Sequence, residues 1–388
     1  MQRPGSPHGT HTVSRREWLA TSLAAVALSA CGQPRQVVVV SPQRIAGGDE
    51  LESLALRTME KYQIPGLSLA VVRDGRLRTQ RSYGLNDMEL GLKATDDTVY
   101  QLASVTKVFT SVAIGILVDE GAISLGASIS EFLPGLPTGW SKVQLHHLLE
   151  HTSGLPSSTG ANPRFGAEES LRRMRDRFVD EAKLDYFTAA ERLEFLKELP
   201  LAFEPGAKWS YNQPGYMLLG MIIERVTKKP FEIFMRDRIF TPLSMRSARF
   251  GDSRVVVPGR RQVAYTRQFG PLQNWLWPYS TSDYPAAGLN ATAGDVARLF
   301  IALGTALVKP GTLDRLWQQP LLASGTRPAY ALGWTVGEVK GRKVVGHEGG
   351  GCAWIAHVPS ERVTAIALCN LAGSGADMGA KVAELLIA

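Results

Sequence analysis

The chain has 388 residues, of which 44% are apolar, 20% charged and 8% aromatic, and its formal net charge is +7. This mixture is typical of a globular protein, and it excludes collagen-like, disordered and multi-span membrane proteins. The length allows two or three domains of about 150 residues each, or one large fold. Three cysteines are too few for a disulfide scaffold or a four-thiolate zinc module.

The first 31 residues have the pattern of an export signal. The pair Arg15-Arg16 precedes an uncharged run rich in Ala and Leu over residues 19–30, which is typical of a twin-arginine signal. The run is shorter than the about 20 residues of a membrane-spanning helix. It ends in Leu-Ser-Ala-Cys, which resembles a lipoprotein cleavage site, so we expect lipid on Cys31. Ordinary signal cleavage or a buried thiol is the alternative.

These features predict a protein on the periplasmic side, attached to a membrane through Cys31. Gly32 is not the aspartate that retains lipoproteins at the inner membrane, which favours the outer membrane. Residues 32–46 show no pattern and are interpreted as a tether. Without residues 1–31 the formal charge is +5, and no basic run indicates a nucleic-acid partner.

The N-terminal part of the remaining chain predicts a helix, a hairpin and a second helix. Apolar spacing predicts the first helix over 49–63, and strands at 67–72 and 77–83 flank the turn Asp74-Gly75. Residues 104–120 are apolar almost all round, which is typical of a helix buried at the centre of a domain.

The middle of the chain is helical and its end is rich in strands. Further helices are predicted over 142–151, 168–200 (with a capping box from Thr188 to Glu191), 216–226 and 292–303. Strands are predicted over 330–336, 343–346, 353–358 and 364–368, before a helix over 376–386. The order predicts an α/β (α+β) fold over 47–388. It has an antiparallel sheet built from N- and C-terminal segments and flanked by helices, with a helical subdomain over about 110–290 inserted.

A candidate nucleophile lies at the start of the buried helix. Ser104 and Lys107 are three residues apart, so their side chains share one helix face. A lysine can activate a serine when burial lowers its pKa, and the helix N-terminus favours developing negative charge. A lone Ser-x-x-Lys occurs by chance about once in a chain of this length, so the assignment depends on further motifs.

Two further motifs follow in order. They are Pro205-Gly206-Ala-Lys-Trp-Ser-Tyr211-Asn-Gln213-Pro-Gly-Tyr216 and Gly346-His347-Glu-Gly349-Gly350-Gly351. With Ser104-x-x-Lys107 they resemble the three motifs of serine β-lactamases and penicillin-binding proteins, and the class C-like serine hydrolases most closely. His151-Thr-Ser-Gly154 and the segment 287–295 fit the same resemblance, which covers residues 47–388.

The resemblance implies acyl transfer through a covalent serine ester. Ser104 would be the nucleophile, and Lys107 and Tyr211 would share the general-base and proton-return roles. The backbone N–H groups of Ser104 and Gly350 would form the oxyanion hole, on a strand whose glycines, Gly349 among them, let the substrate approach. The resemblance implies no metal and no organic cofactor.

Two substrate-binding positions depart from the family pattern. Gln213 stands where the second motif has asparagine, and His347 stands where many β-lactamases have lysine. A neutral histidine pairs weakly with a substrate carboxylate, and packing on the core is its alternative role. We therefore expect hydrolysis of an ester, amide or D-amino-acid peptide, and peptides derived from peptidoglycan belong to this class. A class C-like β-lactamase and a non-catalytic penicillin- or cell-wall-binding module remain alternatives.

Other patterns leave alternatives open. His147-x-x-Glu150-His151 matches a zinc metallopeptidase motif, although the predicted helix ends directly after it. The aromatic residues between Tyr265 and Tyr284, including Trp275 and Trp277, fit either internal packing or an apolar wall for the substrate.

If Cys31 carries the lipid, it is the membrane anchor, and the other two cysteines remain as a pair. Cys352 and Cys369 are then equally far from the predicted turn at Ser360-Glu361, so they would face each other across two strands. A disulfide bridge and two buried free thiols both fit this placement.

Overall fold

The computed structural model describes residues 50–156, 188–251, 261–275, 280–303, 305 and 307–387. Residues 41–388 form one compact unit. The expected export signal, Cys31 and the tether lie outside the described residues. In the described part of the chain, no helix is long and apolar enough to cross a membrane.

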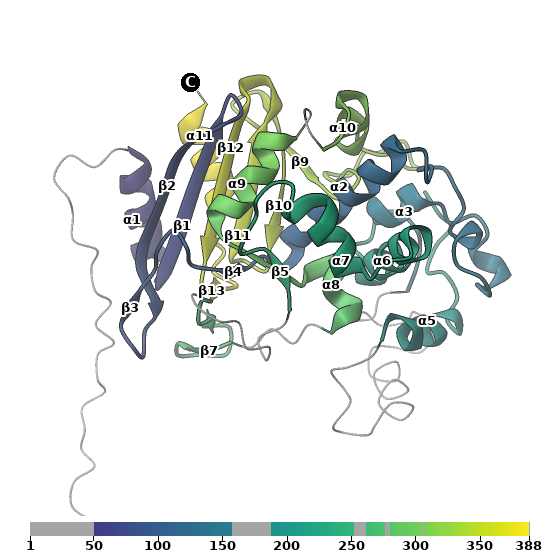
Figure 1. The fold of residues 1–388 in the computed structure, drawn as a ribbon, viewed down its shortest axis with the longest axis horizontal. Helices are drawn as coiled ribbons and strands as arrows, with labels where there is room; N and C mark the ends of the chain where they lie inside the picture. Colours follow the sequence, from purple (N-terminus) through teal and green to yellow (C-terminus); the bar gives the residue numbers. More distant parts are fainter. Residues whose placement is uncertain are drawn as a thin grey trace, which may run out of the picture. The chain divides into compact units, whose positions relative to one another are not determined.

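A seven-stranded antiparallel sheet joins strands from both ends of the chain, in the order β3-β2-β1-β12-β11-β10-β9 (Figure 1). Its strands are β1 Gly66–Arg73, β2 Arg76–Asp87, β3 Leu92–Lys93, β9 Thr335–Val339, β10 Arg342–Gly349, β11 Ala353–Val358 and β12 Val363–Cys369. The N-terminal β1 pairs with the C-terminal β12, with Leu67 opposite Cys369. The fold class predicted from the sequence is therefore confirmed.

Both faces of the sheet are covered, because successive residues of a strand point to opposite sides. Leu67, Leu69 and Val71 of β1 belong to one buried cluster, and Ala70 and Val72 belong to the other. The first cluster includes residues of two terminal helices, α1 Glu50–Tyr62 and α11 Met378–Leu386. The second includes residues of α2 Thr106–Asp119 and α9 Ala293–Ala302.

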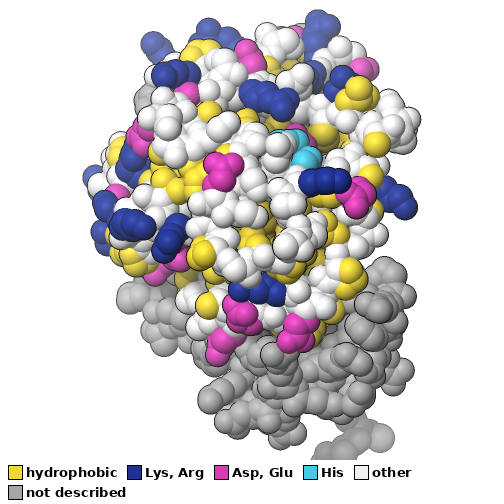
Figure 2. Space-filling model, turned by 90° about the vertical axis from the view of Figure 1, so that its right-hand side faces the viewer, with side chains coloured by type: hydrophobic (Ala, Val, Ile, Leu, Met, Phe, Trp, Pro, Cys, Tyr) yellow, Lys and Arg dark blue, Asp and Glu magenta, His cyan; other side chains and the backbone are white. Residues whose placement is uncertain are grey.

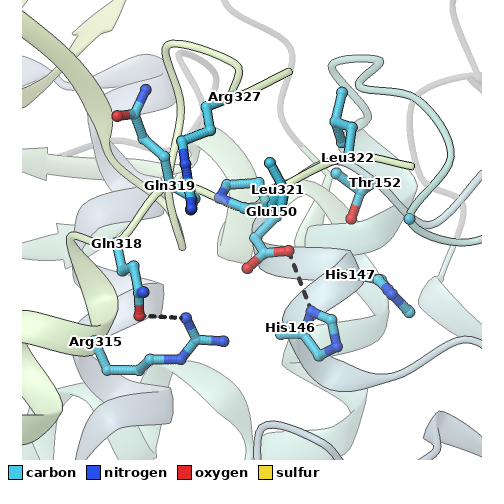
Figure 3. Close-up of a pocket in the computed structure, with 12 residues that line it drawn as sticks. His146, His147, Glu150, Thr152, Arg315, Gln318, Gln319, Leu321, Leu322 and Arg327 are labelled. Carbon is cyan, nitrogen blue, oxygen red and sulfur yellow. Dashed lines mark hydrogen bonds and ion pairs between the residues drawn. The ribbon is translucent and has the colours of Figure 1, made fainter. Parts of the chain in front are cut away.

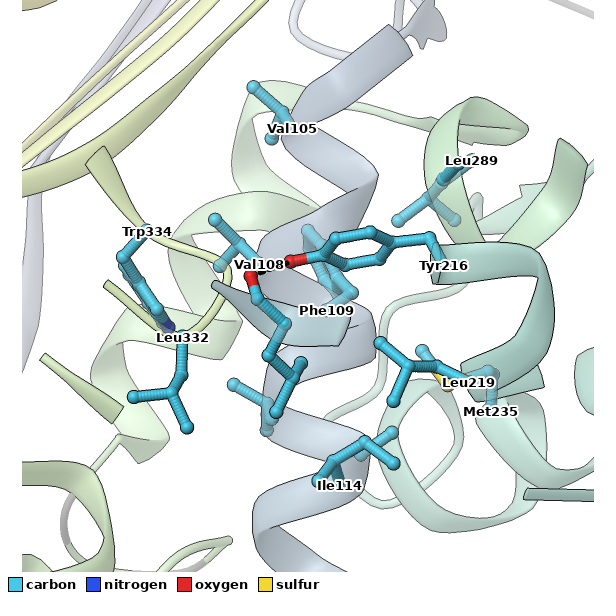
Figure 4. Close-up of a cluster of buried hydrophobic side chains, with 14 of the residues drawn as sticks. Val105, Val108, Phe109, Ile114, Tyr216, Leu219, Met235, Leu289, Leu332 and Trp334 are labelled. Atoms are coloured by element: carbon cyan, nitrogen blue, oxygen red, sulfur yellow. Dashed lines mark hydrogen bonds between the residues drawn. The ribbon is translucent and has the colours of Figure 1, made fainter. Parts of the chain in front are cut away.

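Helix α2 lies at the centre of the larger cluster. Residues from Thr106 to Leu117 are all buried, as the all-round apolar sequence predicts. Figure 4 shows Val108 and Phe109 of α2 among side chains from other elements, including Tyr216 and Trp334. This packing fixes the helix that follows the turn carrying Ser104.

A helical region lies beside the sheet. Its helices are α3 Leu145–Leu149, α5 Ala189–Lys197, α6 Gln213–Thr227, α7 Phe231–Met235, α8 Tyr284–Ala287 and α10 Pro310–Leu316. Within the predicted stretch 168–200, the described part is α5, which begins at the predicted capping box of Thr188 and Glu191. Short turns of helix are η1 Ala103–Val105, η2 Ile129–Glu131, η3 Thr138–Trp140, η4 Arg236–Phe240, η5 Thr281–Asp283 and η6 Pro359–Glu361.

Two small sheets complete the unit. One is formed by β4 Tyr100–Gln101, β8 Leu289–Ala291 and β5 Arg249–Phe250, and the other by β13 Leu371–Ala372, β6 Tyr265–Thr266 and β7 Gln273–Asn274. Phe269, between β6 and β7, is 68% exposed and its ring stacks on Trp275 at 6.0 Å. Trp277, of the predicted aromatic wall, lies outside the described residues.

Several predicted elements have different bounds in the structure, and for two of them the backbone gives the reason. The strand predicted over 330–336 is wrong at its start, because β9 begins at Thr335 after a turn in which Gly333 has φ +92°. The helix predicted over 142–151 is only α3, and His151 beyond it has φ +61°, which is incompatible with a continuing helix.

Cys352, in the turn directly before β11, lies beside Cys369, the last residue of β12. The N–H of Cys369 donates to the carbonyl oxygen of Cys352 at 2.7 Å. Both thiols are buried and free, so the alternative of two free thiols is confirmed and the bridge is not formed.

Candidate active site

Ser104 lies in a strained turn that leads into α2. The preceding residue, Ala103, has φ +45°, a conformation that costs free energy for any residue with a side chain and that is common at functional sites. The N–H of Val105 donates to the carbonyl of Leu102 at 3.1 Å and closes the turn. Ala103 and Val105 are buried, whereas Ser104 is partly exposed. The turn therefore presents the hydroxyl of Ser104 at the surface of a rigid core.

Lys107 lies one helical turn further and is completely buried. Its Nζ is 3.4 Å from Oγ of Ser104 and donates to the carbonyl oxygen of Ala286 at 2.9 Å. Burial lowers the pKa of Lys107 well below its usual value, and the nearby Asp283 carboxylate acts in the opposite direction. The site thus favours a neutral amine, which is able to accept a proton.

Tyr211 completes the group around Ser104. Its ring lies under Nζ of Lys107, 4.8 Å from ring centroid to nitrogen. Burial raises the pKa of Tyr211 above its usual value of 10, although a hydrogen bond with Ser104 acts in the opposite direction. The pKa directions of Lys107 and Tyr211 agree, because both favour a neutral amine beside a protonated phenol.

An aromatic cluster surrounds His151 behind Tyr211. The His151 ring centroid lies 4.3 Å from that of Tyr211, 4.7 Å from Tyr330 and 5.3 Å from Tyr216. Nδ1 of His151 accepts a hydrogen bond from the N–H of Asn212 at 3.1 Å, so the neutral ring carries its proton on Nε2. Burial lowers the pKa of His151 well below 6.5, and Lys107 adds to this effect.

His347 is buried beside this cluster, and both its ring nitrogens have partners. Nε2 lies 2.9 Å from the hydroxyl of Tyr330, and Nδ1 lies 2.6 Å from the carbonyl oxygen of Glu348. The carbonyl can only accept, so Nδ1 carries the proton and Tyr330 donates to Nε2. Burial lowers the pKa of His347 to about 3, and Lys107 contributes. His347 is therefore neutral and held by the protein rather than turned toward a substrate carboxylate.

The glycines of β10 bring that strand against the turn of Ser104. A Cβ atom on Gly349 would lie only 2.2 Å from the carbonyl oxygen of Leu102, so no larger residue fits without displacing the turn. The next residue, Gly350, is exposed and has φ +56°. The structure thus places Gly350, the expected oxyanion donor, directly after the residue that contacts the nucleophile turn.

The start of α6 carries the other expected substrate residue. Asn212 caps the helix, because its Oδ1 accepts from the N–H of Gly215 at 2.8 Å, while its Nδ2 donates to the carbonyl of Leu155 at 2.9 Å. Gln213 is the first residue of α6, and its Oε1 is buried without a hydrogen-bond partner among the described residues. Asn212 thus fixes the segment on which Tyr211 and Gln213 lie.

The structure gives the three residues of the His147, Glu150 and His151 motif partners other than a common metal site. Among the residues that the structure describes, no group of three His, Cys, Asp or Glu side chains could hold a metal ion. Nδ1 of His147 accepts from the N–H of Gln144, Glu150 bonds to His146, and His151 turns into the aromatic cluster. The left-handed backbone of His151 separates it from the helix that carries the other two.

Sequence reasoning identified Ser104 and Lys107 by their spacing and Tyr211 by the family resemblance, and the structure brings these three together. It did not assign Tyr330 or the His151 ring to the site. Tyr330 has no motif around it that signals a site residue, whereas His151-Thr-Ser-Gly154 was noted only as part of the family pattern. The sequence therefore carries a signal for His151 but none for Tyr330.

Comparisons with known proteins agree with this fold. The sequence profile of the family described as Beta-lactamase matches residues 51–388. The chain is 28% identical over 311 residues to the N-acetylmuramyl-L-alanine amidase of Bacillus subtilis (strain 168), covering 70% of this chain and 66% of that protein. It is 28% identical over 251 residues to a putative D-alanyl-D-alanine carboxypeptidase of Salmonella enteritidis, covering 60% of this chain and 55% of that protein. The chain thus spans two thirds or less of these relatives.

A solved structure shares the architecture. The octameric penicillin-binding protein homologue from Pyrococcus abyssi has a TM-score of 0.72 and 25% sequence identity. The match covers 87% of this chain and 76% of that one.

Proposed function

The chain belongs to the beta-lactamase family, and we propose on that premise that it is a serine hydrolase that forms an acyl-enzyme on Ser104. It cleaves neutral esters and amides, including amides and peptides of D-amino acids. The observation that carries the proposal is the contact between Ser104 and Lys107. A completely buried amine with a lowered pKa lies 3.4 Å from a partly exposed serine hydroxyl.

The pKa directions favour Lys107 as the general base. A neutral Lys107 amine accepts the proton of Ser104 as Oγ attacks the substrate carbonyl carbon. The N–H groups of Ser104 and Gly350 stabilise the negative charge on the substrate oxygen. Tyr211, held protonated, donates its proton to the leaving group and regains one from Lys107. Water then attacks the acyl-enzyme, and Ser104 recovers its proton as the ester bond breaks.

The surroundings of His347 favour substrates that carry no carboxylate next to the scissile bond. His347 is neutral and bonded through both ring nitrogens, so it offers no cation at the position where many β-lactamases have lysine. We expect slow hydrolysis of β-lactams, whose carboxylate would lack this partner, and faster hydrolysis of neutral esters and amides. The likeness to an amidase supports this substrate class.

Covalent labelling tests the nucleophile. A fluorophosphonate probe should label the wild-type chain and fail to label Ser104→Ala, because only an activated serine reacts. Ser130→Ala removes an exposed serine in η2 and is the matched control, which should be labelled as wild type. Equal labelling of wild type and Ser104→Ala would contradict the proposal.

Turnover of paired substrates tests the specificity. The p-nitroanilides of D-alanine and L-alanine, p-nitrophenyl acetate and nitrocefin should be compared at equal enzyme concentration. Faster turnover of nitrocefin than of all the substrates without a carboxylate would overturn the substrate class while leaving the nucleophile intact. Labelling without any turnover would favour a penicillin- or cell-wall-binding module.

Lipid attachment at Cys31 and a periplasmic location on the outer membrane are part of the proposal. The export pattern supports them, together with relatives whose names refer to cell-wall substrates. Incorporation of radiolabelled palmitate into wild type but not into Cys31→Ser, followed by membrane fractionation, is the test. Equal incorporation in both would contradict the anchor.

A further inference from the structure

A pocket lies apart from the group of residues around Ser104. It has a volume of about 250 Å³ and lies between α3 with the segment that follows it and α10 with the loop that reaches Arg327 (Figure 3). Pockets for drug-sized ligands span roughly 300–1,000 Å³, so this space suits a smaller molecule. Figure 2 shows the side of the molecule at the right of Figure 1, where Lys and Arg side chains lie near a histidine that reaches the surface.

The pocket combines two cations with a buried carboxylate. Arg315 and Arg327 line it, and each donates one N–H within the protein, to Oε1 of Gln318 and to the carbonyl of Gln319 respectively, both at 2.7 Å. A guanidinium carries five N–H donors, so each arginine retains donors for a ligand. Glu150, which also lines the pocket, is 2% exposed.

The carboxylate of Glu150 is held in place by His146 on one side. Oε2 of Glu150 lies 3.1 Å from Nδ1 of His146, whose Nε2 is bonded to Oε1 of Gln144 at 2.7 Å. Figure 3 shows Glu150 in the middle of the lining residues, with His146 below it. A simple anion bound by the arginines would therefore also face a fixed negative charge.

A buried hydroxyl in the lining has no partner. Thr152 is completely buried, and its Oγ1 makes no hydrogen bond with the described residues. Buried polar atoms are almost always hydrogen-bonded in native proteins. A polar ligand that reached this hydroxyl would give it the partner that it lacks among the described residues.

We propose that the pocket binds a small free α-amino acid as its zwitterion. The carboxylate is bound by Arg315 and Arg327, the ammonium group by Glu150, and Thr152 supplies a further hydrogen bond. Separate positive and negative groups in a pocket of this size match the two charges of an amino acid, whereas neither an anion nor an amine alone satisfies both.

The same segment connects the pocket to the site of the proposed reaction. Glu150 and Thr152 flank His151, whose ring lies 4.3 Å from that of Tyr211. The carbonyl of His151 accepts from the N–H of Ser210 at 2.9 Å, which fixes the residue before Tyr211. An amino acid in the pocket is therefore linked to the position of Tyr211, and the coupling is reciprocal. This consequence rests on the proposed function, but binding itself does not.

Titration calorimetry and thermal melting test the binding with glycine, D-alanine, L-alanine, acetate and ethylamine as probes. We expect the amino acids to bind the wild-type chain and raise its melting temperature, and acetate and ethylamine to bind more weakly. Arg327→Gln should weaken amino-acid binding by about tenfold or more, because it removes charge-assisted hydrogen bonds. Arg342→Gln, which removes a surface partner of Glu361, is the matched control and should bind as wild type.

Thr152→Val separates binding from folding. Valine has nearly the same shape and leaves no unpaired hydroxyl, so the ligand-free variant should melt no lower than wild type while binding amino acids more weakly. Three results would overturn the proposal: no binding of any amino acid to wild type, acetate binding as tightly as alanine, or unchanged alanine binding by Arg327→Gln. Fluorophosphonate labelling of Ser104 does not depend on this pocket, so the two proposals fail separately.

Discussion

Replacing Gly349 with alanine tests whether catalysis requires the close contact between β10 and the turn of Ser104. The added Cβ would lie 2.2 Å from the carbonyl oxygen of Leu102, whereas ordinary van der Waals contacts begin at 3.4 Å. The strand and the turn must therefore separate by about 1.2 Å. That displacement moves the N–H of Gly350 away from the substrate oxygen above Ser104.

The expected loss follows from this displacement. A misplacement of about 1 Å in an active site costs about 10²-fold in rate, and removing one oxyanion donor costs about 10²–10³-fold in kcat. We expect kcat for a p-nitrophenyl ester to fall by about 10²–10³-fold, with a smaller change in KM. Forcing a methyl group into a packed contact also lowers the free energy of unfolding by about 1–3 kcal/mol.

The control is Gly337→Ala on the neighbouring strand β9, where a Cβ would meet no atom within 4 Å. This variant should keep wild-type kcat and melting temperature. Circular dichroism melting and the fluorophosphonate labelling stoichiometry show whether Gly349→Ala is folded when it is assayed. A folded Gly349→Ala variant with wild-type kcat would refute the reasoning that this contact positions the oxyanion donor.

Three further predictions concern protons and thiols. Lys107→Met should lower kcat/KM by about 10²–10⁴-fold. In wild type, kcat/KM should rise with pH at a pH well below 10.5, since burial lowers the pKa of Lys107. A rise centred near pH 10.5 would contradict this. Burial lowers the pKa of His347 to about 3 and of His147 to about 4. At a pH between these pKa values and 6.5, the unfolded chain binds protons that the folded chain does not. The free energy of unfolding, measured in urea, should therefore fall as the pH falls from 6.5 toward 4. A free energy that stayed constant over this range would contradict the prediction. Because Cys352 and Cys369 are free, the thiol titre of the denatured chain should be the same with and without reductant, and a higher titre with reductant would reveal a bridge.

Local chemistry and periodicity are the parts of this molecule that its sequence predicts well. The all-round apolar pattern of 104–120 corresponds to a helix buried on every side, because only a central helix can hide such a surface. The Asp74-Gly75 turn joins β1 to β2, since its two residues tolerate the positive φ that a tight hairpin needs. Ser104 and Lys107 could be paired because one helical turn brings them together.

Contacts between distant segments could not be predicted in the same way. The hydrogen bond from Tyr330 to His347 depends on a turn at Gly333 that ends the predicted strand early. The neutral, fully bonded state of His347 depends in turn on Tyr330, so the sequence alone indicated a substrate-facing histidine. The contact between the tilted rings of His151 and Tyr211 likewise depends on one left-handed residue, which no periodicity reveals.

The pairing of β1 with β12 has a consequence for how the protein is made. Gly349 leaves the ribosome 245 residues after Ser104, and the central strand pair joins Leu67 to Cys369. Contacts between such distant residues form slowly and late in folding. A partly synthesised chain therefore carries Ser104, the proposed nucleophile, without Gly350, its proposed oxyanion donor. We expect hydrolytic activity only once synthesis has passed β12, so that unfinished chains stay inactive.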